Sequence, residues 1–115
     1  MQGTLLAQDF LSTIGLALKQ GKASAVAVYF DQTVDLSFSD KSDTYSKKQA
    51  ELILQKFLVK VETKNYFNLQ VGTSEYNHTK YSIGTLVTGN GNYKVYMLFV
   101  PRGGHYHLKE LRFEK

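Results

Sequence analysis

The sequence predicts an α+β domain in which N-terminal helices pack on a curved antiparallel sheet. Apolar residues recur mostly at helical spacing as far as Val61, and from Asn65 onward they recur at every second residue. Helices followed by a run of strands are typical of an α+β plan, in which the helices cover one face of the sheet. The chain has 115 residues and neither a linker nor a repeat, so we expect a single domain over 1–115.

The first half of the chain is expected to begin with two helices and a strand. Apolar residues at helical spacing predict a helix over about 9–19, ended by Gly21; they are Leu6, Phe10, Ile14 and Leu18. Ser24–Phe30 is expected to form a short second helix, with apolar residues on one face. Val34–Phe38 alternates apolar and polar residues, which predicts a half-buried strand.

The segment Asp40–Gln49 joins this strand to a third helix. Ser46 and Gln49 form a capping box, in which the serine hydroxyl accepts from the Gln49 amide and the Gln49 side chain accepts from the Ser46 amide. The residues before Ser46 are interpreted as a turn, because Asp and Ser favour turns and helix N-termini. An apolar stripe then predicts the third helix; its members are Ala50, Ile53, Leu54, Phe57, Leu58 and Val61.

The second half is expected to form a meander of four strands. Their predicted ranges are 65–76, 79–88, 92–101 and 105–114, and the turns between them are Asn77-His78, Asn90-Gly91 and Gly103-Gly104. Together with Val34–Phe38, this predicts five strands in all.

In the last hairpin the apolar alternation slips by one residue between Leu108 and Leu111. A β-bulge at Lys109-Glu110 restores the phase and bends the sheet around the helices. The expected pairs are Phe99 with Tyr106, Met97 with Leu108, Val95 with Leu111 and Tyr93 with Phe113. A sheet curved over helices makes a cone, and a cone can hold a pocket.

The outer face of the sheet is the candidate interface. Its predicted residues are half apolar and rich in tyrosine, which is typical of a protein–protein surface; we single out Tyr96, Leu98, His107 and Arg112. A homodimer through this face is therefore expected. The alternative is a set of scattered surface apolar residues with no partner.

Composition excludes several classes of function. With no cysteine, disulfides, thiolate chemistry and thiolate metal sites are ruled out. The net charge of +4 is mild, and the lysines of the third helix are interpreted as a solvated face, so no nucleic-acid partner is expected. No apolar run approaches the roughly 18 residues that a membrane-spanning helix needs.

Asp40, Asp43 and Tyr45 form the main candidate acid–base set, and we place them at the mouth of the expected cone. A carboxylate in an apolar pocket can act as a general base, and a tyrosine hydroxyl can stabilise an oxyanion. The alternative is that these residues only form the turn before the helix. His105 and His107 share one side of a strand, but no third ligand has diagnostic spacing, so neither a metal nor another cofactor is expected.

The order of elements resembles the nuclear transport factor 2-like superfamily, also called cystatin-like or SnoaL-like. The ending Gly104–Glu114 looks like the last strand of that superfamily, with an aromatic after a glycine turn and a bulge before the final apolar pair. Three segments look like an uncharacterised family of small exported domains from Bacteroidetes: Tyr29–Asp31, Asp40–Ser46, and Tyr81–Thr88 with Asn90-Gly91.

The resemblance implies a cone-shaped domain over nearly the whole chain, but it does not choose a function. The superfamily contains ketosteroid isomerase-like and dehydratase enzymes as well as non-catalytic binding and dimerising modules. The enzymes resemble one another in placing Asp, His or Tyr inside the cone, whereas the cone-facing strand positions assigned here are nearly all apolar. We therefore expect a non-catalytic domain that dimerises and binds a small apolar ligand or a protein partner. The alternative is an isomerase- or dehydratase-like enzyme that uses a carboxylate and a tyrosine at the mouth.

The resemblance also implies export to the periplasm or beyond. Leu5–Gln8 would then be the remnant of a trimmed signal, with Ala7 near the cleavage point. Equally, this short apolar opening can be the first turn of a helix.

Overall fold

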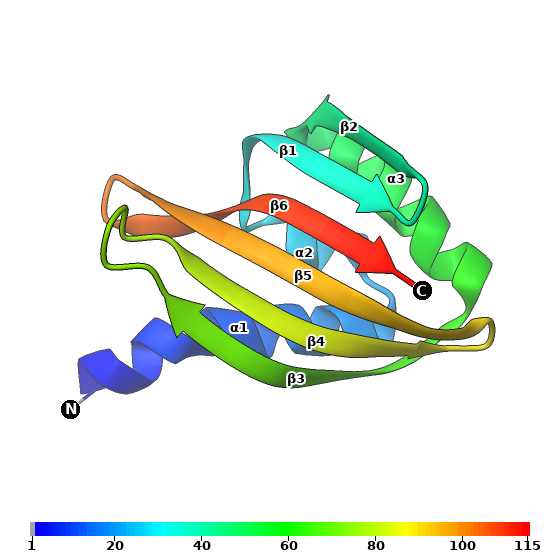
Figure 1. The fold of residues 1–115 in the computed structure, drawn as a ribbon, viewed down its shortest axis with the longest axis horizontal. Helices are drawn as coiled ribbons and strands as arrows, with labels where there is room; N and C mark the ends of the chain where they lie inside the picture. The colour runs from blue at the N-terminus through cyan, green and yellow to red at the C-terminus, as the bar shows by residue number, and fades with distance from the viewer. Residues whose placement is uncertain (1) are drawn as a thin grey trace.

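Three helices and six strands make up residues 2–115, the part of the chain that this computed structural model describes, with side chains described from residue 10 onward. The elements are α1 (Gln2–Gln20), α2 (Ala23–Ala27), β1 (Phe30–Phe38), β2 (Lys41–Ser46), α3 (Lys47–Val61), β3 (Thr63–Thr73), β4 (Lys80–Thr88), β5 (Gly91–Arg102) and β6 (His105–Glu114). The strands form one sheet, and the helices lie on one face of it (Figure 1). The predicted α+β class, with N-terminal helices packed on a curved sheet, is confirmed.

The strand order across the sheet is β2-β1-β6-β5-β4-β3. β1 runs parallel to β6, so the first strand of the chain lies beside the last, while the other neighbours in the sheet are antiparallel. α1 packs along β3, α3 packs on β1 and β2, and α2 contacts both of these helices. The helices thus cover the sheet from one edge to the other.

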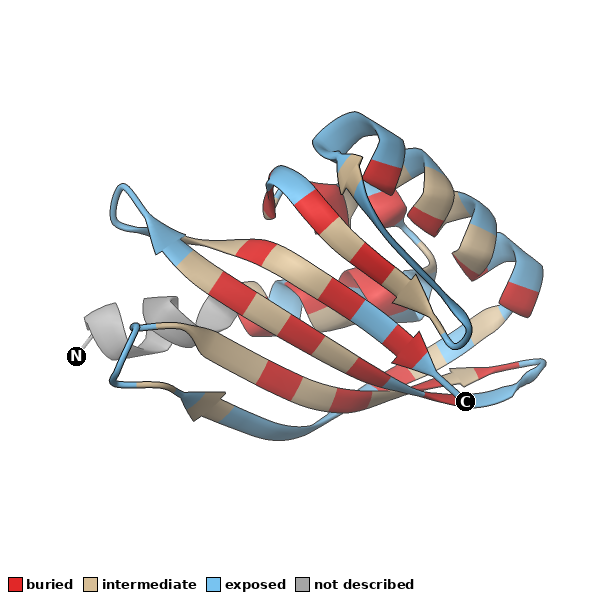
Figure 2. Ribbon diagram, turned by 45° about the horizontal axis from the view of Figure 1, so that its top comes forward, coloured by how far each residue is buried: buried red, intermediate tan, exposed pale blue. Residues whose placement is uncertain are grey.

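The core fills the space between the helices and the sheet. Along β4 and β5, buried positions alternate with half-exposed ones, so each strand turns one face inward (Figure 2). The largest fully buried side chains include Ile14, Leu18, Phe30, Met97, Phe99 and Leu108. Burying a side chain of this size stabilises a fold by roughly 1.5–3 kcal/mol. The interior of the cone is therefore occupied by the protein's own apolar side chains.

The capping box at the start of α3 is confirmed. The Gln49 amide donates to the Ser46 hydroxyl over 3.2 Å, and the Ser46 amide donates to Gln49 Oε1 over 3.4 Å. The helix ends at Val61, and the C-cap residue Glu62 takes a left-handed conformation with φ 58°. The predicted apolar stripe faces the core through Ala50, Leu54, Leu58 and Val61.

The prediction for residues 28–46 was wrong in two respects. β1 begins at Phe30, so the second helix ends at Ala27 and the strand is longer than Val34–Phe38. The residues before Ser46 form the edge strand β2, joined to β1 by the two-residue turn Ser39-Asp40. β2 lacks apolar alternation because an edge strand is exposed on most positions, and Tyr45 is its one half-buried residue. The predicted turn is thus a sixth strand.

In the β5–β6 hairpin the bulge was predicted correctly and the register was wrong. Leu98 pairs with Glu110 and Phe99 with Leu108, which leaves Lys109 as the extra residue. The observed pairs nearest the predicted ones are Phe99 with Leu108, Met97 with Leu111 and Val95 with Phe113. The reason is the turn: Gly103 and Gly104 have φ of 58° and 84°, so these two residues form the whole loop and Arg102 pairs with His105. The partners of Phe99 and Val95 shift by two residues, and that of Met97 shifts by three because it moves across the bulge, so the inward and outward faces stay as predicted.

Two sequence predictions fall on the beginning of the chain. The inward face proposed for Leu6 and the signal remnant proposed for Leu5–Gln8 concern side chains outside the described ones. Within the described part of the chain, none of the helices has both the length and the apolar character needed to cross a membrane.

Candidate functional site

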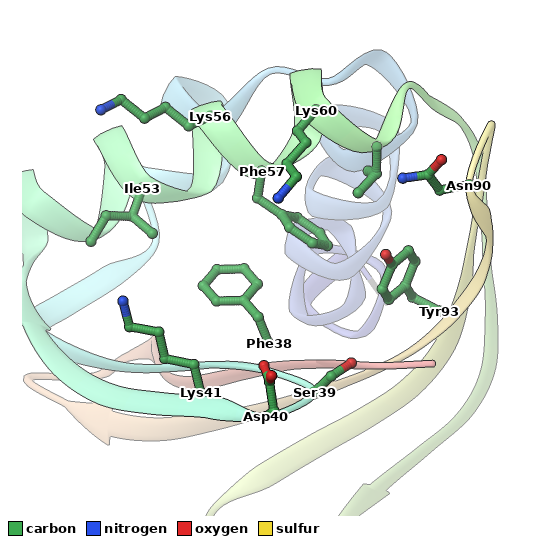
Figure 3. Close-up of a pocket in the computed structure, with 11 residues that line it drawn as sticks. Phe38, Ser39, Asp40, Lys41, Ile53, Lys56, Phe57, Lys60, Asn90 and Tyr93 are labelled. Carbon is green, nitrogen blue, oxygen red and sulfur yellow. The ribbon is translucent and has the colours of Figure 1, made fainter.

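A pocket of about 490 Å³ opens between α3, the β1–β2 turn and the start of β5 (Figure 3). We call it the Phe57 pocket. Its lining residues come from segments far apart in the sequence; they are Phe38, Ser39, Asp40, Lys41, Ile53, Lys56, Phe57, Lys60, Val61, Asn90 and Tyr93. It is open to solvent, and its aromatic lining packs against the buried core.

Three aromatic rings form the floor of the Phe57 pocket. The Phe57 ring centroid lies 4.7 Å from that of Phe38 and 5.4 Å from that of Tyr93. Beneath them, the fully buried Phe113 stacks on Phe38, with centroids 5.7 Å apart and an interplanar angle of 3°. Phe38 and Phe57 are only half buried, so part of each ring faces the pocket. A concave, mostly aromatic floor of this kind suits the apolar body of a small molecule.

The rim of the pocket is charged. Lys41, Lys56 and Lys60 line it, and Asp40 supplies a carboxylate. Figure 3 shows Lys60 reaching over the pocket toward the Phe57 ring, with Lys41 on the opposite wall and Lys56 turned away. The rim thus carries three positive charges against one negative charge.

The predicted set Asp40, Asp43 and Tyr45 does not meet at one point. Asp40 lines the Phe57 pocket, and it is exposed on the β1–β2 turn. Asp43 lies in the middle of β2, where its carboxylate accepts from the Thr44 backbone amide over 2.8 Å. Tyr45 pairs with Val34 and packs against the core. The three are separated because residues 41–46 form an extended strand instead of a turn.

The Phe57 pocket brings one carboxylate and one tyrosine together in another way. Asp40 and Tyr93 both line it, from the β1–β2 turn and from β5. Asp40 is open to solvent, whereas a carboxylate that serves as a general base is usually buried in an apolar site. The Asp40 carboxylate and the Tyr93 hydroxyl therefore offer hydrogen-bonding groups beside the apolar floor.

The floor of this pocket carries no sequence signal of a site. The apolar pattern puts Phe57 and Tyr93 in stripes that face the core, and Phe38 at the end of a strand. These residues do belong to apolar stripes. Residues on the floor of a pocket recur at the same spacing as residues buried in the core, so the sequence pattern does not distinguish the two.

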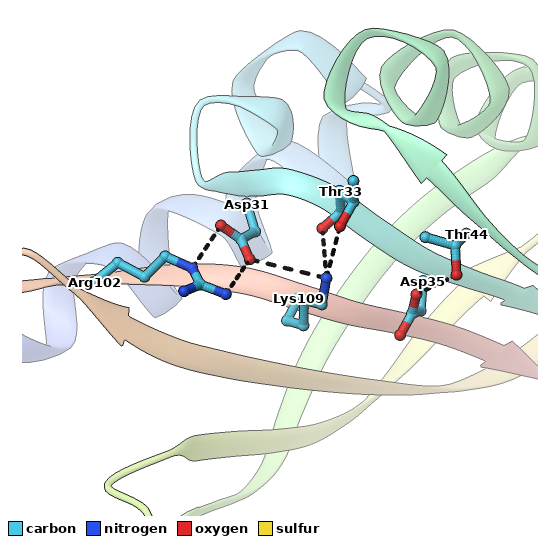
Figure 4. Close-up of polar contacts among 6 residues, drawn as sticks. All are labelled: Asp31, Thr33, Asp35, Thr44, Arg102 and Lys109. Atoms are coloured by element: carbon cyan, nitrogen blue, oxygen red, sulfur yellow. Dashed lines mark hydrogen bonds and ion pairs between the residues drawn. The ribbon is translucent and has the colours of Figure 1, made fainter.

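A second charged site lies at the other end of β1, around the buried carboxylate of Asp31 (Figure 4). The Asp31 side chain is 6% exposed. Arg102 forms a bidentate pair with this carboxylate: Nε donates to Oδ1 over 2.9 Å, and Nη2 donates to Oδ2 over 3.0 Å. Lys109 Nζ lies 4.0 Å from Oδ2 and donates to the Thr33 hydroxyl over 2.7 Å. We call this group the Asp31 network.

The pKa of Asp31 reflects this environment. Burial alone would raise the pKa, but it is outweighed by hydrogen bonds from Arg102 and the Gln32 backbone amide and by the charges of Arg102 and Lys109. The net result is a pKa below the ordinary value of an aspartate, so the carboxylate is held ionised. Its two strong hydrogen bonds join the start of β1 to the end of β5, which is a role in the fold.

Tyr66 is the other acidic group with a clearly shifted pKa in the described part of the chain. Burial raises the pKa of Tyr66 to about 12. Its hydroxyl donates to Asn68 Oδ1 over 3.0 Å, and its ring packs against Gly15 of α1. It lies away from the Phe57 pocket and belongs to the packing of α1 on the sheet.

The four candidate interface residues lie on the outer face of the sheet. Tyr96 stacks on Tyr81 with ring centroids 6.5 Å apart, and the Arg112 guanidinium lies 4.8 Å from the Tyr96 centroid. Leu98 pairs with Tyr81 on β4 and with Glu110 on β6. His107 pairs with Val100 and lies beside the Asp31 network. Tyr96, Leu98 and Arg112 thus share one patch, while His107 lies at its polar border.

The architecture defines the class of this protein. Helices followed by a curved sheet with this strand order form a nuclear transport factor 2-like fold. An NTF2-like protein of unknown function from Cytophaga hutchinsonii is 11% identical, with a TM-score of 0.65 over 93% of this chain and 87% of that chain. That degree of identity supports the fold alone.

The chain belongs to the family described as a domain of unknown function, DUF4783, whose match covers residues 11–114. A DUF4783 family protein from Bacteroides ovatus is 25% identical and has a TM-score of 0.84, over 90% of this chain and 92% of that chain. A second, from Bacteroides uniformis, gives the same identity and TM-score over 90% and 94%. No match was found among curated proteins.

Metal-binding side chains are not clustered in the part of the chain that the structure describes: no group of three or more His, Asp or Glu residues is placed to hold an ion. His105 and His107 stand on β6 without a third ligand of this kind.

Proposed function

We propose that this protein is a non-catalytic binding domain that takes a small molecule with an apolar body into the Phe57 pocket. The observation that carries the proposal is the floor of Phe38, Phe57 and Tyr93, partly uncovered at the base of a pocket of about 490 Å³. Pockets of about 300–1,000 Å³ with an apolar lining and a few polar groups are the usual form of small-molecule sites.

A neutral fluorescent probe tests this proposal. N-phenyl-1-naphthylamine, which brightens in apolar sites, is expected to bind the wild-type protein saturably. Phe57→Ala and the milder Ile53→Asn should each weaken binding by about tenfold, equivalent to about 1.4 kcal/mol. Circular dichroism of each variant checks the fold. Leu98→Lys, on the outer sheet face, is the matched control and should leave probe binding unchanged. Equal binding by all variants would place the probe elsewhere and overturn the proposal.

We also propose a homodimer through the outer sheet face. Half-exposed apolar side chains of β4 and β5 cover this face; they are Tyr81, Ile83, Val87, Tyr96, Leu98 and Val100. On the neighbouring strand β3, Phe67 and Leu69 are 52% and 69% exposed. An apolar patch that spans several strands is typical of an interface between chains.

Size-exclusion chromatography with light scattering tests the dimer. Wild type is expected to elute as a dimer, and Leu98→Lys and Leu98→Glu as monomers. Lysine at position 98 would face Glu110, so it should disrupt the interface without harming the fold. Leu52→Lys, at an exposed leucine on α3, is the control and should remain dimeric. A monomeric wild type would refute this part of the proposal.

The alternative function is that of an isomerase- or dehydratase-like enzyme, favoured by Asp40 and Tyr93 lining one pocket. Isomerisation of a β,γ-unsaturated ketosteroid, followed by the ultraviolet absorbance of the conjugated product, is a direct test. Activity that is lost in both Asp40→Asn and Tyr93→Phe would support the enzyme. A rate equal to that of buffer would count against it.

Export to the periplasm or beyond remains a proposal, and it rests on the resemblance to exported domains. Expression of the natural full-length gene product, cell fractionation and N-terminal sequencing of the mature protein would test it. Cleavage near Ala7 supports export, whereas an intact N-terminus in the cytoplasmic fraction contradicts it.

A further inference from the structure

The lysines of the Phe57 pocket have no ionic partner among the described residues. The ion pairs of the described part of the chain are Arg102 with Asp31 and Lys109 with Asp31, and both lie in the Asp31 network. Lys41, Lys56 and Lys60 are exposed, and none of them lies within ion-pair distance of Asp40 or another acid there. The rim therefore presents positive charge that the fold does not neutralise.

The arrangement of these lysines is unfavourable for the protein alone. Lys56 and Lys60 are four residues apart on α3, where two like charges repel each other. Lys115 adds another cation nearby, with Nζ 5.5 Å from the ring centroid of Tyr93, on the pocket floor. A bound anion would relieve this repulsion, and the apolar floor below it would hold an uncharged body.

We infer that the ligand of the Phe57 pocket is an amphipathic organic acid, with a carboxylate or sulfonate head at the lysine rim and an aromatic or aliphatic body on the rings of Phe38, Phe57 and Tyr93. This inference rests on the proposed function, because it names the ligand class of the same pocket. The head pairs with Lys60, which reaches over the pocket, and with Lys41 on the opposite wall (Figure 3). The single opposing charge, Asp40, lies at the edge of the pocket on the turn.

Charge decides between this class and its nearest alternatives. A cationic ligand would meet Lys41 and Lys60 against Asp40 alone, since Lys56 is turned away from the pocket (Figure 3). A neutral ligand would contact the aromatic floor but would form no ion pair with the lysines of the rim. A long polyanion needs a continuous basic track, whereas these lysines surround one aromatic pocket, so a small acid fits best.

A matched pair of probes tests the inference. 8-Anilinonaphthalene-1-sulfonate carries the ring system of N-phenyl-1-naphthylamine with an added sulfonate, so the two differ by the acid head alone. The sulfonate probe is expected to bind about tenfold more tightly at low salt. Raising NaCl from about 20 mM to about 500 mM should remove most of that difference, because exposed charge pairs are screened. Binding of the neutral probe should not change with salt.

Lysine variants locate the effect. Lys60→Met should weaken the sulfonate probe about threefold to tenfold and leave the neutral probe unchanged. Lys48→Met, on the same helix but outside the pocket lining, is the matched control and should change neither. A Phe57→Ala variant should bind both probes about tenfold more weakly.

The outcomes separate the inference from the proposed function. If the neutral probe binds and the sulfonate probe binds no better, the acid class is overturned while the pocket stands. If neither probe binds, the pocket itself fails. If the sulfonate probe binds but Lys60→Met and Lys48→Met weaken it equally, general attraction to a basic protein explains the result and the inference is refuted.

Discussion

The two ends of β1 each gather several cations, and the protein uses them differently. At the start of the strand, Arg102 and Lys109 share the buried carboxylate of Asp31. At its far end, Lys41 and Lys60 stand over an aromatic floor without an ionic partner in the described part of the chain. The cations of the Asp31 network are engaged by the fold, whereas those of the Phe57 pocket remain available to a ligand.

α3 connects these two regions. Its first residue, Lys47, lines the hollow around the Asp31 network, and Lys60, one residue before its end, lines the Phe57 pocket. The comparison predicts that substitutions at the first region change stability, and that substitutions at the second change binding. Each of the following measurements tests that division.

The largest effect is expected for Asp31→Ala. Removing a buried carboxylate leaves Arg102 and Lys109 without their partner and should lower the free energy of unfolding by about 2–3 kcal/mol. This estimate lies below the usual range for a buried ion pair because the Arg102 side chain is 57% exposed. Urea unfolding followed by circular dichroism measures it. A change below about 0.5 kcal/mol, typical of a surface site, would contradict the assigned role.

Lowering the pH should remove the part of this stabilisation that depends on the negative charge of Asp31, and that part is smaller than the effect of Asp31→Ala. The pKa of Asp31 is lowered in the folded protein, so its stabilisation is complete above the unfolded value of about 3.9 and is lost as the pH falls through the folded value. Urea midpoints measured downward from about pH 5 should therefore fall more steeply for wild type than for Asp31→Asn. Parallel pH profiles would show that the carboxylate contributes nothing through its charge.

The Ser46→Ala variant should lose about 1 kcal/mol of stability, because it removes the capping box of α3. Ser46 does not line the Phe57 pocket, so binding of N-phenyl-1-naphthylamine should stay the same below the unfolding transition. Thermal unfolding and probe titration on one sample check both statements. Weakened probe binding in the folded variant would show that the two ends of α3 are coupled.

The smallest effect is expected for Lys60→Met. Loss of the repulsion with Lys56 should raise the stability of the protein slightly, by about 0.2–0.5 kcal/mol. A stabilised variant that binds the sulfonate probe less well would sharpen the contrast between the two regions. Destabilisation by more than about 1 kcal/mol would mean that Lys60 serves the fold after all.

Local signals in the sequence predicted the helices and most of the sheet. The Ser46–Gln49 capping box and the apolar stripe after it define α3, and alternation defines the strands from Asn65 onward. β2 was missed because most of its residues are exposed. An exposed strand does not need apolar residues at every second position, so its sequence shows no alternation. The hairpin register was missed because it depends on the turn: Gly103 and Gly104 both adopt positive φ and together form the whole loop.

The site was harder to predict than the fold. Asp40 was proposed at the mouth of a cone and lines the Phe57 pocket, but Phe38, Phe57 and Tyr93 have the same apolar pattern as residues of the core. The pairing of Asp31 with Arg102 joins residues 71 positions apart, and no local motif connects them. Such contacts follow from the parallel pairing of β1 with β6, which three-dimensional structure alone reveals.

That parallel pairing also sets an order of events during synthesis. β1 can pair with β2 soon after both are made, but its other neighbour, β6, is made after every other element described. Phe113, which supports the rings of Phe38 and Phe57, is delivered by that same late strand. Contacts so distant along the chain are slow to form. The Phe57 pocket therefore takes shape only after β6 has been made, because a nascent chain without β6 lacks the ring that lies beneath the pocket floor.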